Sequence, residues 1–348
     1  LQDVIYDVDT VYGYDLSLMK PVNFVEGGID KVLAKKQCFA NKVPCGFTPF
    51  KAEIKAGEDF SFSTMIGFAG SVEQINAKLA DFTVPGYLDK KFEEAEELAD
   101  SFTSDIKTKT AAGIFDQYVE QCYLDNFLRG GYPYVLNKDG NKSVIHLFSR
   151  KHGDPERDYN FFSIAAEYYS QGNGNFRDVS QNRRNDVFFK KDVGDFNVKT
   201  FFSLIQADGY NPLEVRPSLF NVIEGKEDEV QAYVEESING DATAIKEIVA
   251  GKFTPGQISN TIAKLQLELK IDDGEFIANI LNNCNQNIEA GFAEGYWSDH
   301  WDYNMDLVDN YLSIFPDKID EFLFEDKTYK FYANILSLAK SSSRSKSG

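Results

Sequence analysis

The hydrophobic spacing changes near residue 71, and this change constrains the fold more than any other feature of the chain. From Ala111 onward, apolar residues recur at the spacing of amphipathic helices, interrupted by glycine, proline and polar loops. Thr254 followed by Pro255 is a helix cap followed by proline at the first helical position. We expect helices at 111–128, 158–169, from near 181, 198–207, 227–238, 242–250, 255–269, 274–291 and 301–315. Many consecutive helices joined by long loops indicate paired helices, in a toroid or a solenoid, and the lack of a fixed repeat disfavours an ordinary solenoid.

Before this change, the first seventy residues have the pattern of β structure. Short apolar runs are separated by Gly, Pro and Asn, and Phe60 and Phe62 alternate with polar residues, as in an antiparallel sandwich. Ser71 to Gln74 then forms a capping-box pattern, and a charged segment places Phe92, Leu98 and Phe102 on one helical face. We therefore expect linker helices over 71–108.

Composition and charge exclude several classes of function. The chain has 348 residues and a formal net charge of −19, which disfavours a nucleic-acid partner. Its four cysteines and three histidines lack the spacing of zinc ligands, and no apolar run approaches the roughly 20 residues that span a bilayer. We expect a cytoplasmic protein with free, buried thiols and no membrane partner. Because the chain opens within an alternating pattern and ends in a polar stretch, we also expect it to be a piece of a longer polypeptide.

The segment 168–186 carries the most distinctive chemistry. It places Asp178 among Arg177, Arg183 and Arg184, after an aromatic loop with glycines. An acid among guanidinium groups suits a site that protonates a neutral sugar while an anion such as phosphate binds nearby, because arginine matches phosphate geometry. The alternative is that Arg183 and Arg184 only pair with Asp178 and Asp186 at a helix start.

Three other loops concentrate polar and aromatic residues. In 149–160, Arg150, Arg157 and Asp158 are available to an anion or to sugar hydroxyls, although the segment also fits a solvated helix cap. Segment 206–213 fits a left-handed turn and could place Asp208 or Asn211 at the rim of a site. In 294–304 the candidates are Trp297, Asp299 and His300, since an exposed Trp beside polar groups can hold a sugar face, whereas we expect Trp301 in the core.

The run from Tyr168 through Asp178 to Gln181 resembles the general-acid segment of the cellobiose-phosphorylase-like inverting glycoside phosphorylases, Gly-Phe-Arg-Asp-x-x-Gln. Ser298 to Trp301 is similar to that family's Asp-Asp-His-Leu-Trp helix entry. Asn175 replaces the glycine of the pattern, and Asn182 to Asp186 replaces its Asp-Leu-Leu continuation. With segment 149–160, these departures make the chain more similar to the related β-1,3-glucan phosphorylases.

The resemblance implies a mainly α fold with an N-terminal β part. It comprises the end of a β-sandwich (1–70), linker helices (71–108) and a partial (α/α)6 barrel (109–348). It implies reversible, inverting phosphorolysis of a β-glucan oligosaccharide, β-1,3-glucan being favoured, to α-glucose 1-phosphate. Asp178 would be the general acid, with Arg177 and Gln181 shaping the sugar site. Inorganic phosphate would be the co-substrate, without metal or organic cofactor, in a homodimer.

The phosphate ligands are predicted from the residues themselves. Arg183 and Arg184 point about 100° apart on a helix, so we expect one to face the site and the other to pair with an acid such as Asp186. We expect Arg183 and Arg157 to bind phosphate, with Arg184 as the further candidate. Two alternatives stay open: an inverting glycoside hydrolase with Asp158 or Asp299 as base, and a non-catalytic helical module that binds carbohydrate or protein.

Overall fold

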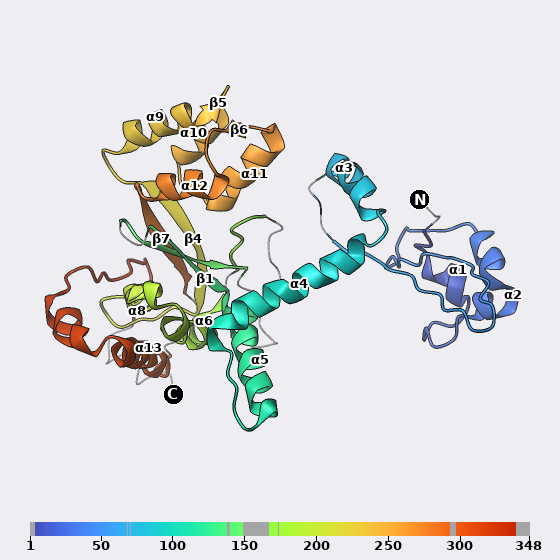
Figure 1. Ribbon diagram of the computed structural model, residues 1–348, viewed down its shortest axis with the longest axis horizontal. Coiled ribbons are helices and arrows are strands. Elements are labelled where there is room, and N and C mark those ends of the chain that lie inside the picture. The colour runs from blue at the N-terminus through green and yellow to red at the C-terminus, as the bar shows by residue number, and fades with distance from the viewer. Residues whose placement is uncertain are drawn as a thin grey trace. The chain divides into compact units, whose positions relative to one another are not determined.

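The computed structural model in Figure 1 describes residues 4–67, 69, 71–137, 140–148, 167–172, 174–292 and 297–338. The chain divides into two compact units, Leu1–Gly67 and Phe68–Gly348. Over these described ranges the fold is mainly helical, with small antiparallel sheets. The helix predicted at 158–169 lies outside them except for residues 167–169, which form a bend and a turn.

The first unit contains α1 (Val8–Tyr12) and α2 (Val22–Leu33). Its core is organised by the buried carboxylate of Asp7, which accepts hydrogen bonds from the Cys38 amide at 2.8 Å and from Lys42 Nζ at 2.9 Å. The only strand-type pairing within residues 4–67 is a bridge between Ile5 and Phe47. The predicted sandwich strands therefore do not form in these residues.

The alternation of Phe60 and Phe62 has a different cause. Both rings pack on Phe50, at centroid distances of 5.6 and 4.8 Å, in a segment without regular secondary structure. A segment with alternating apolar residues forms a strand only where a partner strand supplies the backbone hydrogen bonds.

The second unit begins with the predicted linker helices and continues through a mixed helical and β region. Its helices are α3 (Val72–Phe82), α4 (Tyr87–Thr103), η1 (Ser104–Ile106), α5 (Gly113–Gly130), α6 (Phe176–Arg183), α7 (Asp186–Phe189), η2 (Lys191–Val193), α8 (Phe196–Ser203), α9 (Glu227–Ser237), α10 (Thr243–Val249), α11 (Pro255–Leu265), α12 (Asp273–Leu281), α13 (His300–Ile314), η3 (Pro316–Lys318) and η4 (Glu321–Glu325). Its strands are β1 (Tyr132–Leu136), β2 (Ser143–Leu147), β3 (Gly174–Asn175), β4 (Glu214–Val222), β5 (Ile238–Asn239), β6 (Glu268–Leu269) and β7 (Cys284–Gly291).

Helix starts follow the capping signals of the sequence. The Ser71 side chain accepts from the Gln74 amide ahead of α3, and Thr254 with Gln257 forms a complete capping box at α11. Both predicted starts are confirmed. On α4 the predicted apolar face is only partly covered: Phe102 packs on Phe127 and Tyr132, whereas Phe92 is exposed.

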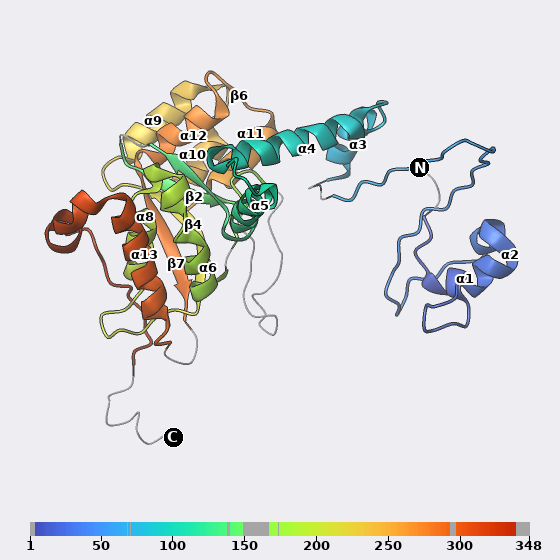
Figure 2. The ribbon, with the colours of Figure 1, turned by 60° about the horizontal axis from the view of Figure 1, so that its bottom comes forward.

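Long strands β4 and β7 form an antiparallel ribbon that the helical prediction did not anticipate. They run side by side in Figure 2, and β3 pairs with the beginning of β4. The register shifts between Val215 and Ser218, where Pro217 cannot donate a ladder hydrogen bond. A single helix over 274–291 is wrong beyond Leu281, because α12 ends there and β7 follows.

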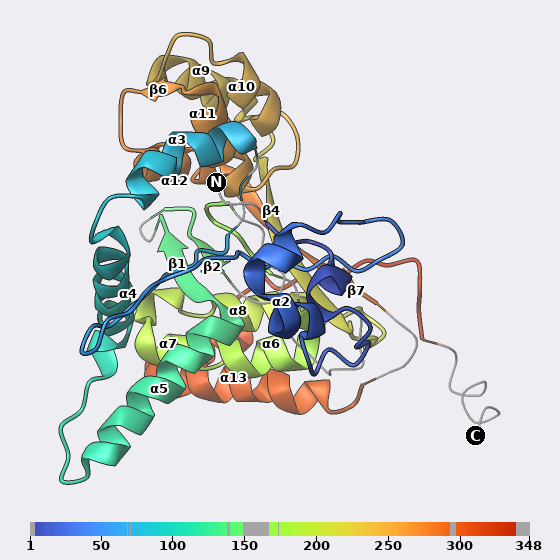
Figure 3. The ribbon, with the colours of Figure 1, turned by 90° about the vertical axis from the view of Figure 1, so that its right-hand side faces the viewer.

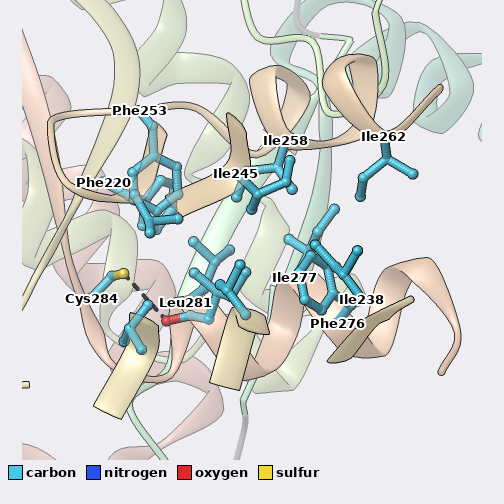
Figure 4. Close-up of a cluster of buried hydrophobic side chains, with 14 of the residues drawn as sticks. Phe220, Ile238, Ile245, Phe253, Ile258, Ile262, Phe276, Ile277, Leu281 and Cys284 are labelled. Carbon is cyan, nitrogen blue, oxygen red and sulfur yellow. Dashed lines mark hydrogen bonds between the residues drawn. The ribbon is translucent and has the colours of Figure 1, made fainter. Parts of the chain in front are cut away.

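Two hydrophobic clusters pack at the two ends of this ribbon. Cluster one joins α9, α10, α11 and α12 to the end of β4 and the start of β7 (Figures 1 and 4), and its largest fully buried side chains include Phe220, Phe253 and Phe276. Cluster two joins α6, α8 and α13 to the opposite end, around Phe176 and Phe201. Each helix group buries its apolar face against a different part of the same two strands.

Candidate functional site

Asp178 lies in the first turn of α6, just beyond the β3 segment. The helix starts there because the side chain of Asn175 accepts a 3.0 Å hydrogen bond from the Arg177 amide, which satisfies one of the free N–H groups of the first turn. Asn175 therefore has a definite role at the position where the resemblance has glycine. A carboxylate in this turn is also favoured by the helix dipole.

The guanidinium of Arg177 holds the Asp178 carboxylate. Arg177 Nε donates to Asp178 Oδ1 at 3.1 Å, and the two side chains keep 33% and 26% of their surface exposed. The pair is therefore accessible to a ligand. The opposite side of α6 is buried, with Phe176 and Val179 in cluster two.

The start of α13 supplies the second half of the site. In Figure 3, α6 lies beside α13, and the two helices are in contact. At the α13 start, the His300 ring stacks on Phe176 at 4.9 Å and on Trp297 at 6.0 Å between centroids. Asp299 is the N-cap residue of α13 but makes no side-chain capping bond. Segment 297–300 thereby places an indole, a carboxylate and an imidazole next to α6.

His300 is neutral at physiological pH. Burial lowers its pKa to about 4, and the nearby Arg177 guanidinium acts in the same direction. The carboxylates of Asp299 and Asp178 oppose this shift, which places both acids within electrostatic reach of the ring. A neutral imidazole offers one donor and one acceptor to a polar ligand.

Several buried polar atoms next to this ring have no hydrogen-bond partner among the described residues. They are His300 Nδ1, both amide atoms of Asn304 and Oδ1 of Asn211. Asn304 follows His300 by one helical turn, and Asn211 donates through Nδ2 to the Trp297 carbonyl at 2.8 Å. Buried polar groups without partners are uncommon, because an unmade hydrogen bond in the interior costs free energy. Nothing in the sequence pattern singles out Asn304, which lies within α13 like any other polar residue of an amphipathic helix.

Arg183 is directed away from this site into a buried polar cluster. It is 8% exposed, burial lowers its pKa to about 10, and the Asp186 carboxylate opposes that shift. Asp186 Oδ2 in turn accepts from Asn197 Nδ2 at 2.9 Å and contacts His146 Nε2 at 2.8 Å. The cluster ties the β2 strand to α7 and α8, and Arg183 lies close enough to Asp186 for their charges to interact.

Arg184 and Gln181 both bind Asp306 on α13. Arg184 Nη1 donates to Asp306 Oδ2, and Gln181 Nε2 donates to the same oxygen at 3.1 Å. Arg183 and Arg184 also line a cavity of only about 10 Å³, the space of one water molecule. That cavity is too small for phosphate.

The structure thus brings together five of the predicted site residues: Arg177, Asp178, Trp297, Asp299 and His300. Arg150, Arg157 and Asp158 lie outside the described residues. Trp301, expected in the core, is 37% exposed and packs edge-on against Phe202. Asn211 lies at the site, as the turn segment 206–213 allowed, while Asp208 caps its own turn by accepting from the Tyr210 amide.

Metal-binding clusters and membrane-spanning helices are both absent from the described ranges. These ranges contain no group of three or more His, Cys, Asp or Glu residues arranged to hold a metal ion. Within the same ranges, no helix combines the length and apolarity needed to cross a bilayer. The four cysteines are free thiols, but only Cys284 is buried, so the prediction of buried thiols is wrong for Cys38 and Cys122, which are exposed.

Comparison of the chain with protein-family models, with curated proteins and with solved structures finds no match. The functional assignment therefore depends on the site itself.

Proposed function

We propose that the protein is an inverting glycoside phosphorylase that converts a β-glucan oligosaccharide, with β-1,3-glucan favoured, and phosphate to α-glucose 1-phosphate. The observation that supports this most is the accessible Asp178 carboxylate, held by Arg177 and close to His300 and Trp297. An acid, a cation and an aromatic surface are the three groups that this reaction needs.

In the proposed reaction, Asp178 reacts in its protonated form and gives that proton to the glycosidic oxygen as the bond to the anomeric carbon breaks. The carboxylate left behind is the form that Arg177 holds. A phosphate oxygen attacks that carbon from the opposite face, so phosphate replaces the water and the general base of an inverting hydrolase. The product is the α-linked sugar phosphate together with an oligosaccharide shorter by one glucose.

The neighbouring side chains would bind and orient the sugar. The half-buried Trp297 ring can contact the apolar face of a pyranose, while neutral His300, which stacks on that ring, and Asn211, which donates to the Trp297 carbonyl, hold the indole in place. Burial keeps these groups fixed in place before the ligand binds, which favours catalysis by positioning.

Arg177 is the arginine best placed to hold phosphate, since its side chain is one-third exposed beside the acid. Arg184 donates to Asp306, and buried Arg183 lies within electrostatic reach of Asp186. We propose a stabilising role for these two arginines in place of the predicted phosphate contact.

The proposal also includes the finer fold and setting that the resemblance implies. In it, α5, α6, α8 and α13 belong to an (α/α)6 barrel of a cytoplasmic, homodimeric enzyme that uses phosphate as its co-substrate and no organic cofactor.

One observation favours a second candidate, an inverting glycoside hydrolase. Asp299 lies near the same imidazole as Asp178, and it makes no capping bond to its own helix. Two carboxylates at one site are what an inverting hydrolase uses, one as acid and one as base.

Product analysis with and without phosphate distinguishes the two reactions. The protein is incubated with a β-1,3-linked glucose oligosaccharide, and glucose 1-phosphate and free reducing sugar are both quantified. The proposal predicts glucose 1-phosphate only when phosphate is present. Reducing sugar released equally in phosphate-free buffer would favour the hydrolase, and no turnover of any β-linked glucan under either condition would favour a binding module.

A further inference from the structure

A second cavity, whose lining shares no residue with the Asp178 site, lies beside cluster one. It has a volume of about 320 Å³, at the lower end of the range for small-molecule sites. Its lining includes Tyr134 of β1, Phe148 after β2, Tyr168 and Tyr169, Ser259 of α11 and Asp273 of α12. The proposed catalytic site uses none of these residues.

The cavity lies toward the opposite end of the β4–β7 ribbon from Asp178. Tyr134 and Tyr169 pack against cluster one, whereas Phe176 belongs to cluster two. Between them, Gln171 exchanges hydrogen bonds with the backbone of Ser218, and Gly174 pairs with Val215. The chain therefore runs along β4 from the cavity to the start of α6, and Tyr169 and Asn175 are at most about 20 Å apart.

The cavity wall is held in a strained and closely fitted conformation. Phe148 and Tyr169 adopt left-handed backbone angles, with φ of 53° and 56°, and the Phe148 amide donates to the Ser170 carbonyl at 2.7 Å. A side chain on Gly256, at the start of α11, would bring its Cβ to 2.5 Å from the Tyr168 carbonyl oxygen. Left-handed bulky residues cost of order 1–3 kcal/mol each and are concentrated at ligand clamps.

The polar groups of the cavity are uncommitted. Across the described ranges, the phenol oxygens of Tyr134 and Tyr169, the Ser259 hydroxyl and the Asp273 carboxylate have no hydrogen-bond partner. Burial raises the Tyr169 pKa to about 12, so that its phenol remains a donor at neutral pH. Aromatic faces combined with hydroxyls and one carboxylate suit a neutral polyol ring, which presents both apolar C–H faces and hydroxyl groups.

Charge and donor type distinguish this ligand from the other candidates. The carboxylate of Asp273, with Asp272 next to it in sequence, disfavours an anion. An aromatic site with one carboxylate could also attract a quaternary ammonium ion, but such a cation makes no use of the hydroxyls of the three tyrosines and Ser259. A neutral sugar uses both the aromatic faces and every polar group.

We propose that this cavity binds a glucose ring of an oligosaccharide, as a sugar-binding site separate from Asp178. The choice of glucan as the ligand rests on the proposed function, whereas the cavity and its chemistry do not. The site would retain a glucan chain near the enzyme while another part of the chain reacts.

Tryptophan emission separates the two sites in a binding experiment. Both tryptophans of the chain, Trp297 and Trp301, lie at the start of α13, and the cavity contains none. Titration with a β-1,3-linked glucose pentasaccharide is therefore followed by calorimetry, which detects both sites, and by tryptophan fluorescence, which reports the Asp178 site.

We expect calorimetry on wild type and on Asp178→Asn to show a binding event that fluorescence does not follow. Tyr168→Ala and Asp273→Asn should each weaken this event about fivefold or more. Tyr168 is 69% exposed, so its replacement leaves the core intact, and the similarly exposed Tyr118 on α5 provides the matched control, Tyr118→Ala, which should bind like wild type.

Absence of the fluorescence-silent event in wild type would overturn the proposal, as would unchanged binding in both cavity variants. Displacement of the pentasaccharide by choline at equal concentration would also overturn it, in favour of a cation site. If the fluorescence-silent binding event is present but no glucose 1-phosphate forms, the proposed function is refuted and the second sugar site is retained. Phosphorolysis without the silent event refutes only the second sugar site.

Discussion

The two neighbouring residues Arg177 and Asp178 carry the proposed chemistry, and their environment follows from the local sequence. Asn175 starts α6, the helix start exposes Asp178, and the adjacent guanidinium holds its carboxylate. The Asp178 segment was recognisable in the sequence because acid and cations are contiguous. Asn304 was not, because its burial depends on which helix packs against α6. For Arg183 the sequence left a phosphate contact and a pairing with an acid equally open.

Arginine replacements test which cation holds phosphate. Lysine keeps the charge but loses the two-pronged donor geometry, so Arg177→Lys should raise the phosphate KM more than the glucan KM. Arg184→Lys provides the control, since Arg184 binds Asp306, and its phosphate KM should stay within about twofold of wild type. Steady-state kinetics with each substrate varied measures these KM values. A raised phosphate KM in Arg184→Lys with an unchanged phosphate KM in Arg177→Lys would reject the assignment.

The titration of His300 tests the burial of the site. Its folded-state pKa of about 4 lies below the ordinary value of 6.5, so the unfolded chain binds more protons between these values. The stability from neutral His300 is therefore fully present above pH 6.5 and is lost as the pH falls toward 4, by about 2 kcal/mol after allowance for solvent screening. An NMR titration of the imidazole should give a midpoint near 4, and a midpoint near 6.5 would contradict the buried placement.

At the scale of elements, the sequence predicted helices well and strands poorly. The starts of α3 and α11 were predictable because caps act locally. The segment of β7 was predicted as helix because residues 284–291 contain too few apolar residues to show the alternation of a strand. Its strand conformation depends on pairing with β4, which lies about sixty or more residues earlier in the chain. The sequence therefore located α13, but it placed a helix start near residue 181, in the last turn of α6, and did not predict the ribbon that separates their cluster from cluster one.

The capping box of α11 gives an element-scale prediction. Thr254→Ala removes the side-chain oxygen that accepts from the Gln257 amide, and we expect a loss of about 1 kcal/mol in the free energy of unfolding. Thr254→Ser keeps this oxygen and should lose much less. Urea denaturation of the three proteins measures both changes, and equal stability of the Ala and Ser variants would show that the cap contributes nothing.

For the second unit as a whole, the β4–β7 ribbon should make the two clusters unfold together. Phe276 is fully buried in cluster one, so Phe276→Ala should destabilise that cluster by about 3–5 kcal/mol. The tryptophans lie at α13, whose inner side packs in cluster two. If the ribbon couples the clusters, Phe276→Ala lowers the urea midpoint measured by tryptophan fluorescence by the same amount as the midpoint measured by far-UV circular dichroism. An unchanged fluorescence midpoint would mean that the clusters unfold independently.

Phosphate release from α-glucose 1-phosphate in the presence of a β-1,3-linked glucose acceptor tests the central claim most directly. We predict release by wild type, a loss of at least about 100-fold in kcat for Asp178→Asn, and near-normal release by Asp309→Asn, whose carboxylate lies on an exposed part of α13. Phosphate release by Asp178→Asn at the wild-type rate would contradict the role of Asp178 as general acid.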